Sequence, residues 1–555
     1  MDPIQSSETN TTILSVKNLT CIPKRTGTRV VDDISFEIFK GQSVGLLGES
    51  GVGKTTLFRA ILGLLPGSDW NIKGDIFIDD ISVVGLSPRK LEATRGRKVR
   101  CIFQEPAQSL NPSLKIDRQL VEAITTITPK LNEKEAWGKA AQALLDAGLS
   151  DPEMVINRYP GDLSGGQRQR VGIAMSLCRQ CSILLADEPS NSLDSLTVTE
   201  LIDTLKRLKK QEYLGSIFCV THDLSVLKAL EADRVLFMHD GKLYESGSIE
   251  ETLSNPRHEK LEEMVNLAKT VNRHLGDCEG NEERQFADTL ISIDNTNFAF
   301  QKKSLFKKKQ SLVLRDINFE IKRGEFLALV GSSGSGKSTI GGLLSRIFTG
   351  FTGEIDFSGI NLKKFKNRKE KEKFYRSLQV VFQDPADTFD PSITMRQNLS
   401  ECFKAMGLDK RQISSSLGEL LELLLLEERT LDEFPRNLSG GQKQRFALLR
   451  AFGAEPAVII ADEPFTHLDL IAQNRLIEYL KRRKQDSKNQ LSCVLISHEI
   501  GIVSKLCDRI IVIDEGKIVE NNLVDRIINY PEHKVTIKLI KAAKMLGTFD
   551  SFGSE

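Results

Sequence analysis

Two glycine-rich stretches of this 555-residue sequence have the spacing of loops that hold phosphate groups. Residues 48–55 and 331–338 both follow the pattern G-x-x-x-x-G-K-[ST], and each comes after an apolar run and opens a helical pattern. Glycines let successive backbone N–H groups curl around phosphate, the lysine reaches the β and γ phosphates, and the final hydroxyl holds Mg²⁺. The two loops predict two nucleotide sites. The predicted nucleotide contacts in them are Gly48, Glu49, Ser50, Gly51, Val52, Gly53, Lys54, Thr55 and Thr56, and Gly331, Ser332, Ser333, Gly334, Ser335, Gly336, Lys337, Ser338 and Thr339.

A pair of adjacent carboxylates follows an apolar strand in each half of the chain. The pairs are Asp187-Glu188 and Asp462-Glu463. The first carboxylate is placed to hold Mg²⁺ through water, and the second can polarise the water that attacks the γ phosphate. Such a pair at a strand end is otherwise commonly a solvated turn, but the upstream phosphate loop favours a catalytic role. The metal ligands predicted from these residues and the loop hydroxyls are Thr55, Asp187, Ser338 and Asp462.

A third element, Leu-Ser-Gly-Gly-Gln, also occurs twice, at 163–167 and 438–442. Each copy opens a helical pattern, over 167–178 and 442–452, so a hydroxyl and glycine amides sit at a helix N-terminus, which binds anions. At this point the chain resembles the nucleotide-binding domains of ABC transporters, whose signature is LSGGQ, and the resemblance covers nearly the whole sequence. It assigns nucleotide contacts to Ser164, Gly165, Gly166 and Gln167, and to Ser439, Gly440, Gly441 and Gln442.

The two halves are a tandem duplication. Their equivalent residues differ by 275 to 283 positions, as Leu163 and Leu438 (438 − 163 = 275) or Lys54 and Lys337 (337 − 54 = 283) show. The resemblance implies an α/β fold of tandem P-loop NTPase domains of the ABC type, each with a RecA-like α/β core, an antiparallel β region and a helical signature lobe. The expected parts are an N-terminal tail (1–12), domain 1 (13–257), a helical extension and linker (258–289), domain 2 (290–532) and a C-terminal extension (533–555).

Outside these motifs the pattern predicts helices over 259–273 and 535–546, and a flexible polar linker over 277–284. Two lysine-rich segments, 302–309 and 363–373, are interpreted as solvated loops, with a membrane-surface or RNA contact as the alternative.

The resemblance also gives roles to residues that would say little alone. Gln104 and Gln383 match the Q-loop, whose amide contacts metal and water, so both are further predicted metal ligands. His222 and His498 match the switch histidine that contacts the γ phosphate. Residues 192–194 and 467–469 match the D-loop, with His467 where the first copy has Ser192. The predicted catalytic residues are Lys54, Gln104, Glu188, His222, Lys337, Gln383, Glu463 and His498.

In the family, each ATP lies between the phosphate loop of one domain and the signature of the other. The resemblance therefore pairs Lys54 with Ser439 and Lys337 with Ser164, and because both halves keep the full set, two hydrolytically competent sites are expected. The family stacks adenine on an aromatic residue before the phosphate loop. Phe300 is the candidate in the second half, whereas 19–23 in the first half offers none.

Two further elements resemble one branch of the family, the oligopeptide, dipeptide and nickel importer ATPases. Segments 105–112 and 384–391 look like its (E/D)-P-x-x-S-L-N-P element, and 255–258 and 530–533 like its Pro-x-His segment. The branch implies an ATPase that powers import of peptides or a related small solute, nickel or a metal chelate included. It implies two transmembrane permease subunits and an extracytoplasmic solute-binding protein as partners, and a place on the cytoplasmic face of the inner (plasma) membrane.

Composition limits the alternatives. A net charge of +1 gives no basic field for nonspecific nucleic-acid binding, and nine scattered cysteines fit a reducing cytosol. The most apolar helical run, 417–426, is too short to cross a bilayer, so any membrane function needs other subunits. Some branch members hold an iron–sulfur cluster after an ATPase half. Cys278 stands alone in the linker and no cysteine follows Cys507, so no cluster is expected.

Two other classes remain open. One is a soluble ABC ATPase acting on ribosomes or nucleic acid, which the lysine-rich segments would suit. Such proteins typically lack the importer-like element, and the ribosome-bound class has a long charged helical linker that 277–284 does not resemble. The other is the ATPase of a sugar or cofactor importer, which differs only in its partners.

Overall fold

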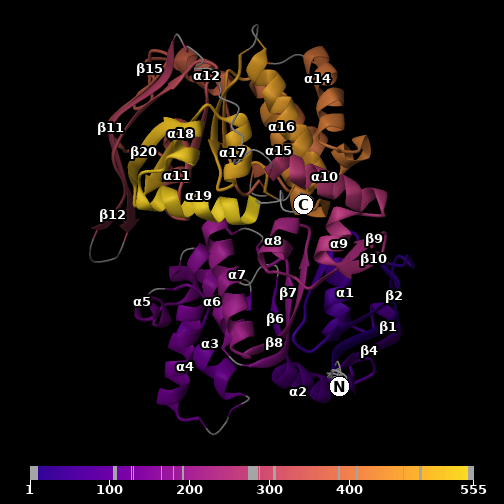
Figure 1. Cartoon of the computed structure of the whole chain (residues 1–555). Coiled ribbons are helices and arrows are strands. Elements are labelled where there is room, and N and C mark those ends of the chain that lie inside the picture. The colour runs from indigo at the N-terminus through magenta and orange to yellow at the C-terminus, as the bar shows by residue number, and fades with distance from the viewer. Residues whose placement is uncertain are drawn as a thin grey trace, which may run out of the picture. The chain divides into compact units, whose positions relative to one another are not determined.

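The chain, described from a computed structural model (Figure 1), contains two compact units. Unit 1 comprises the residues up to Leu193 and Thr197–Asn266, and unit 2 comprises Asp194–Leu196 and Leu267–Gly547. Each unit has an antiparallel sheet, a second and mainly parallel sheet, and a helical lobe, as the sequence predicts. The structure describes residues 11–49, 51–103, 109–126, 128, 131–149, 151–163, 165–178, 180–190, 193–272, 286, 288–303, 308–385, 388–407, 410–466, 468–486 and 490–547.

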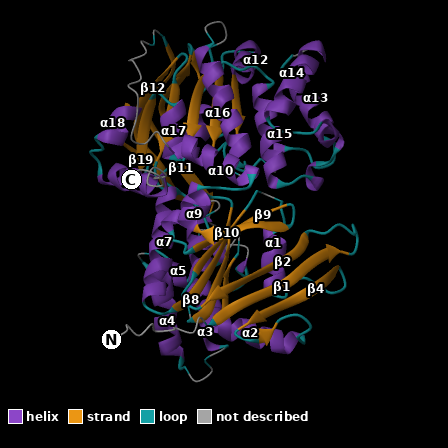
Figure 2. Cartoon of the chain, turned by 45° about the vertical axis from the view of Figure 1, so that its right-hand side comes forward, coloured by secondary structure: helices purple, strands orange, loops and turns teal. Residues whose placement is uncertain are grey.

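The antiparallel sheet of unit 1 has the strand order β2-β1-β4-β5, and Figure 2 shows β1 between β2 and β4. One face of this sheet is buried, because apolar side chains alternate with polar ones along β4. That face packs in one core cluster with the first helix of the unit, α1. The bounds are β1 (Thr12–Pro23), β2 (Val31–Phe39), β4 (Trp70–Ile78), β5 (Ile81–Ser82) and α1 (Lys54–Ile61).

The second sheet of unit 1 has the order β10-β9-β3-β8-β7-β6. Its central strand β3 pairs in parallel with β8 and β9, and β10 is an antiparallel edge strand. Every residue of β3 is buried, as expected for a parallel strand covered on both faces. Ligands of such sheets bind outside the carboxyl ends of the strands. The bounds are β3 (Ser43–Leu47), β6 (Val99–Ile102), β7 (Cys181–Asp187), β8 (Leu214–Thr221), β9 (Arg234–His239) and β10 (Lys242–Ser248).

The helical lobe of unit 1 packs around its own apolar cluster. Two of its helices begin at side-chain caps: Asn132 and Glu135 form a reciprocal capping box at α4, and Asp151 caps α5. The lobe contains α3 (Ile116–Thr125), α4 (Glu133–Asp146), α5 (Pro152–Ile156), η2 (Pro160–Asp162) and α6 (Gly165–Leu177). The other helices of this half are α2 (Pro88–Lys98), α7 (Ser195–Lys210), α8 (Leu224–Ala229), α9 (Ile249–Ser254) and α10 (Glu259–Asn272), the last being the helix predicted over 259–273.

Unit 2 repeats the two sheets, with orders β12-β11-β14-β15 and β16-β17-β18-β13-β19-β20. Its central strand β13 pairs in parallel with β18 and β19. The bounds are β11 (Thr289–Lys303), β12 (Lys308–Lys322), β13 (Phe326–Val330), β14 (Thr352–Phe357), β15 (Ile360–Asn361), β16 (Leu378–Val381), β17 (Val458–Asp462), β18 (Ser492–Ile496), β19 (Arg509–Asp514) and β20 (Lys517–Leu523).

The helices of unit 2 follow the same plan. Thr394 and Gln397 form a capping box at the start of α13, which opens the helical lobe. The bounds are α11 (Lys337–Leu344), α12 (Arg368–Ser377), α13 (Met395–Ala405), α14 (Lys410–Leu423), η4 (Glu428–Asp432), η5 (Pro435–Asn437), α15 (Gly440–Phe452), α16 (Leu470–Gln485), α17 (Ile500–Leu506), α18 (Val524–Asn529) and α19 (Lys534–Gly547). Among the residues that the structure describes, no helix combines the length and apolar character needed to cross a bilayer.

The interpretation of the two lysine-rich segments as loops is wrong for most of their described residues. Lys302 pairs with Lys309 across β11 and β12, because the hairpin continues the register of the strands before it. Within 363–373, α12 begins at Arg368, where the Asn367 side chain accepts a hydrogen bond from the N–H of Glu370. The predicted linker 277–284 lies outside the described residues.

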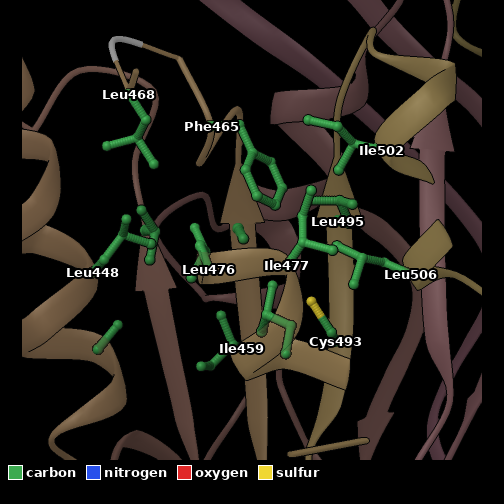
Figure 3. Close-up of a cluster of buried hydrophobic side chains, with 14 of the residues drawn as sticks. Leu448, Ile459, Phe465, Leu468, Leu476, Ile477, Cys493, Leu495, Ile502 and Leu506 are labelled. Carbon is green, nitrogen blue, oxygen red and sulfur yellow. The ribbon is translucent and has the colours of Figure 1, made fainter. Parts of the chain in front are cut away.

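We expect one large loss of stability from a substitution in the core of unit 2. Phe465 is 1% exposed and lies among Leu476, Leu495 and Ile502 (Figure 3). Phe465→Ala should lower the free energy of unfolding of unit 2 by about 3–5 kcal/mol, because it leaves a cavity as well as losing apolar burial. The shift of the calorimetric unfolding transition measures this. Ile347→Ala, at a side chain that is 50% exposed, is the control and should change it by less than about 0.5 kcal/mol; equal effects would contradict the packing argument.

Candidate active sites

The two phosphate loops leave the central strand of each parallel sheet and end at a helix. A Cβ atom on Gly48 would lie 2.3 Å from the carbonyl oxygen of Met238, and one on Gly331 would lie 2.2 Å from that of Ile513. Only glycine fits so close to the neighbouring strand. The glycine before the lysine has a φ of 105° in unit 1 and 109° in unit 2, a conformation that L side chains rarely adopt.

The lysine of each loop points back into the loop. The ammonium of Lys54 donates to the carbonyl oxygens of Gly48 and Glu49, both at 2.8 Å, and Lys337 makes the two equivalent bonds at 2.9 Å. Burial lowers the pKa of both lysines. Because both ammonium groups lie inside their loops, a triphosphate bound in either loop would contact one of them.

The first carboxylate of each acid pair has the features of a magnesium ligand. The hydroxyl of Thr55 hydrogen-bonds Asp187, and the hydroxyl of Ser338 hydrogen-bonds Asp462. The Oδ1 atom of each aspartate is buried and has no hydrogen-bond partner among the described residues. Burial raises the pKa of both aspartates to about 6. An unpartnered buried carboxylate oxygen beside a hydroxyl is an oxygen donor set that fits Mg²⁺.

The second carboxylate of each pair is held by a special backbone conformation. Glu188 has a φ of 46° and Glu463 a φ of 49°, so the chain turns sharply at the strand end. Their N–H groups donate to the carbonyl oxygens of Val220 at 2.8 Å and Ile496 at 2.9 Å, on the neighbouring strand. After this left-handed turn, Glu188 Oε1 lies 3.9 Å from the ammonium of Lys54, and, against the larger effect of burial, the charge of Glu463 acts to raise the pKa of Lys337.

Each glutamate also contacts the switch histidine of its own unit. The distance from His222 Nδ1 to Glu188 Oε2 is 3.1 Å, and that from His498 Nδ1 to Glu463 Oε1 is 2.9 Å. Burial acts to lower the pKa of each histidine, but the interaction with the adjacent glutamate outweighs it. The net result raises the pKa of His222 above its ordinary value and that of His498 to about 9. In unit 2 the imidazole is therefore protonated near neutral pH. In both units the histidine and glutamate lie side by side at the position from which a water could be activated.

The pair in unit 2 predicts a pH-dependent stability. Because the folded pKa of His498 lies above the ordinary 6.5, the pair stabilises the fold fully below about pH 6.5, and this is lost as pH rises through about 9. His498→Gln should therefore lower the free energy of unfolding by about 1–3 kcal/mol at pH 6 and by much less at pH 9.5. Thermal unfolding at the two pH values measures the difference. A loss independent of pH would contradict the ion pair.

The second signature forms the start of α15. The N–H of Gln442 donates to the Ser439 hydroxyl at 3.2 Å, and the N–H of Ser439 donates to Gln442 Oε1 at 2.9 Å. This capping box fixes the turn and leaves Gly440 and Gly441 in the first helical turn, where N–H groups have no partner within a helix. In unit 1, α6 begins at Gly165.

The structure brings together, in each unit, the predicted lysine, loop hydroxyl, aspartate, glutamate and histidine. Gln383 follows β16 by two residues and is exposed. Phe300 is 40% exposed near the end of β11. The predicted site residues Ser50, Gln104 and Ser164, the D-loop residues Ser192 and His467, and Cys278 lie outside the described residues.

One residue that supports the site was missed by the motifs. Gln444, fully buried in α15, donates through Nε2 to the carbonyl oxygen of Pro464 at 3.2 Å. Pro464 follows Glu463 directly, so this bond ties the signature helix to the loop that holds the glutamate. The sequence signal that could have identified Gln444 is its polar side chain on the core-facing side of an amphipathic helix.

The fold and these groups define a class: a hydrolase with two P-loop nucleotide sites. The family model described as "ABC transporter" matches residues 31–191 and 314–466. The chain belongs to the ABC transporter family, with two ATP-binding cassettes fused in one polypeptide, and it hydrolyses ATP.

Relatives match over nearly the full length. The peptidoglycan transport ATP-binding protein YejF of Agrobacterium fabrum (strain C58) is 34% identical over 551 residues, covering 97% of each chain. The glutathione import ATP-binding protein GsiA of Salmonella choleraesuis (strain SC-B67) is 31% identical over 568 residues, covering 96% of this chain and 89% of its own. The dimeric ATP-binding cassette MJ0796 with ADP and phosphate is a similar solved structure, with 28% identity, 42% coverage of this chain, 98% of its own and a TM-score of 0.39.

Proposed function

We propose that this chain is the ATPase subunit of an importer for peptides or peptide-like solutes. The observation that carries the proposal is that both units keep a full hydrolytic set in one chain, and relatives over nearly its whole length are named for peptidoglycan transport and glutathione import. Its proposed partners are two transmembrane permease subunits and an extracytoplasmic solute-binding protein. Its proposed place is the cytoplasmic face of the inner membrane.

In the proposed mechanism each residue acts on the triphosphate or on water. Lys54 and Lys337 move from the loop carbonyls to the β and γ phosphates, and the glycine amides surround them. Bound Mg²⁺ would supply positive charge against the charge that develops on the phosphate. We assign its retention to the aspartates of the acid pairs, to the loop hydroxyls and to Gln104 and Gln383.

The attacking water is oriented by Glu188 or Glu463, each held by its left-handed backbone and its histidine. His498, protonated beside Glu463, can donate to an oxygen of the γ phosphate as charge develops there, and His222 has the same place beside Glu188 in unit 1. Amides at the signature helices supply further donors for the same oxygens. Binding and release of phosphate at these groups would move the permeases through the loops after Gln104 and Gln383.

Purification and reconstitution test this function. The tagged full chain, isolated from detergent-solubilised membranes, should bring down two permease subunits. In proteoliposomes, its ATPase rate should rise when the binding protein is supplied with short peptides or glutathione. Sedimentation with ribosomes rather than membranes would overturn the transporter proposal. Stimulation by a sugar and not by peptides would overturn the proposed solute class.

A further inference from the structure

The first strand pair of unit 2 carries an exposed aromatic group that unit 1 lacks at the same place. Phe300 on β11 packs edge-to-face on Phe298 and Phe348, with ring centroids 5.0 and 5.3 Å away, and leaves 40% of its surface exposed. It is the residue to which adenine stacking is assigned in the second nucleotide site. In the first half, the corresponding residues 19–23 include no aromatic side chain.

A shared irregularity of the two antiparallel sheets fixes which residues correspond. Asn18 has a φ of 48° and Asn295 a φ of 46°. Each faces a glycine of the neighbouring strand: a Cβ on Gly74 would lie 2.4 Å from the carbonyl oxygen of Asn18, and one on Gly353 would lie 2.3 Å from that of Asn295. These paired distortions are the same feature in both units, so residues can be counted from them.

Counting from these residues shows that the aromatic residue is on the first strand in unit 2 but on the neighbouring strand β4 in unit 1. The fifth residue after the asparagine is Phe300 in unit 2 and Pro23 in unit 1. The fourth residue before the glycine is Thr349, which is exposed, in unit 2 and Trp70 in unit 1. Unit 1 therefore has an aromatic residue where unit 2 has a threonine, and a proline where unit 2 has the aromatic.

The strand register places Trp70 directly beside Pro23, the position equivalent to Phe300. Pro23 of β1 and Trp70 of β4 are cross-strand partners, and side chains opposite each other lie on the same face of a sheet. Two residues along, Cys21 pairs with Ile72, and both belong with Trp70 to the cluster that includes α1. Trp70 is only partly buried there, so part of its indole remains accessible.

This face is also the one that borders the phosphate loop. A Cβ on Gly53, the residue before Lys54, would lie 2.5 Å from the carbonyl oxygen of Val30, and Val31 pairs with Cys21. Trp70 lies two residues beyond that pair, roughly 7 Å along the strand, and on β4 rather than β2, about 10 Å across β1, so the two positions are roughly 12 Å apart. A nucleotide whose phosphates lie in the loop has its base at a distance of this order.

We propose that Trp70 is the adenine-stacking residue of the first nucleotide site, replacing the aromatic residue that the first strand lacks. The inference rests on the proposed nucleotide sites and adds the contact for the base. An indole face offers a larger stacking surface than a phenyl ring, and stacking tolerates any base because it needs only a π face.

The two tryptophans of the sequence, Trp70 and Trp137, make the first test direct. Trp137 is in α4 of the helical lobe, so Trp137→Phe leaves Trp70 as the single reporter in the full chain. Saturating ATP with Mg²⁺ should change the Trp70 emission with the same midpoint as ATP binding measured by calorimetry. Binding without a change in emission would overturn the inference and leave the nucleotide sites intact. Absence of any ATP binding would instead overturn the proposed function.

A second test separates stacking from packing. In a Lys337→Ala background, which weakens the second site, Trp70→Leu should raise the Kd for ATP by about 5- to 100-fold, and Trp70→Phe should restore most of the affinity. Affinity for inorganic tripolyphosphate, which has no base, should be unchanged by Trp70→Leu. Equal loss for ATP and tripolyphosphate would mean that Trp70 only supports the fold, and unchanged ATP affinity would overturn the contact.

Discussion

The double variant Glu188→Gln/Glu463→Gln should lose at least about 100-fold in ATP turnover while still binding ATP. Each glutamate contacts the histidine of its unit, and Glu188 also lies 3.9 Å from the ammonium of Lys54. Loss of a positioned general base typically costs about 10²- to 10⁴-fold. Glutamine keeps the shape and can still accept a hydrogen bond from the histidine, but it cannot take a proton from water. ATP affinity should stay the same or tighten, because one negative charge near the γ phosphate is gone from each site.

The single variants decide whether both sites work. If the two units contribute equally and independently, each single substitution leaves about half of the turnover. A strongly unequal pair of losses would contradict two equivalent sites. Glu372→Gln, at an exposed glutamate of α12 that pairs with Arg368, is the matched control and should leave turnover unchanged. Phosphate release and equilibrium binding of ATP on the same preparations measure both quantities.

The central strands show how far sequence can locate such a site. The apolar runs that precede the two phosphate loops are the strands β3 (Ser43–Leu47) and β13 (Phe326–Val330), because a strand buried on both faces is continuously apolar and a glycine-rich loop ends it. The helices predicted after the two signatures are present as α6 and α15. Where an apolar run of strand length is followed directly by a glycine-rich loop, the local sequence pattern is sufficient to locate the strand.

Local sequence patterns could not predict features that depend on pairing between segments far apart in the chain. The importance of Trp70 follows from its register with Pro23, which lies 47 positions away (70 − 23 = 47). The role of Gln444 follows from its bond to Pro464. The helix α12 was missed because its solvent face is charged and it buries Phe374 alone, so it has almost no apolar periodicity.

A second large effect is expected from the aspartates that precede the catalytic glutamates. In Asp187→Asn/Asp462→Asn the amide oxygen can still accept from the loop hydroxyl, but the charge that would hold Mg²⁺ is removed. The Mg²⁺ concentration for half-maximal ATPase activity should rise by about 10- to 100-fold, as for loss of a group that holds a metal through its ligands. Binding of metal-free ATP in EDTA should not weaken, because a negative charge has been removed from the phosphate site.

Unfolding distinguishes this effect from damage to the fold. Burial raises the pKa of both aspartates from an ordinary 3.8 to about 6. Ionisation of these carboxyls therefore destabilises the folded state, and this loss of stability develops as pH rises from about 3.8 through about 6. Asparagine carries no such cost, and the thermal midpoint of the metal-free double variant at pH 7.5 should equal or exceed that of the parent. Asp432→Asn, at an exposed aspartate paired with Arg396, should alter neither property. An unchanged Mg²⁺ requirement in the double variant would show that the buried Oδ1 atoms face something other than the metal.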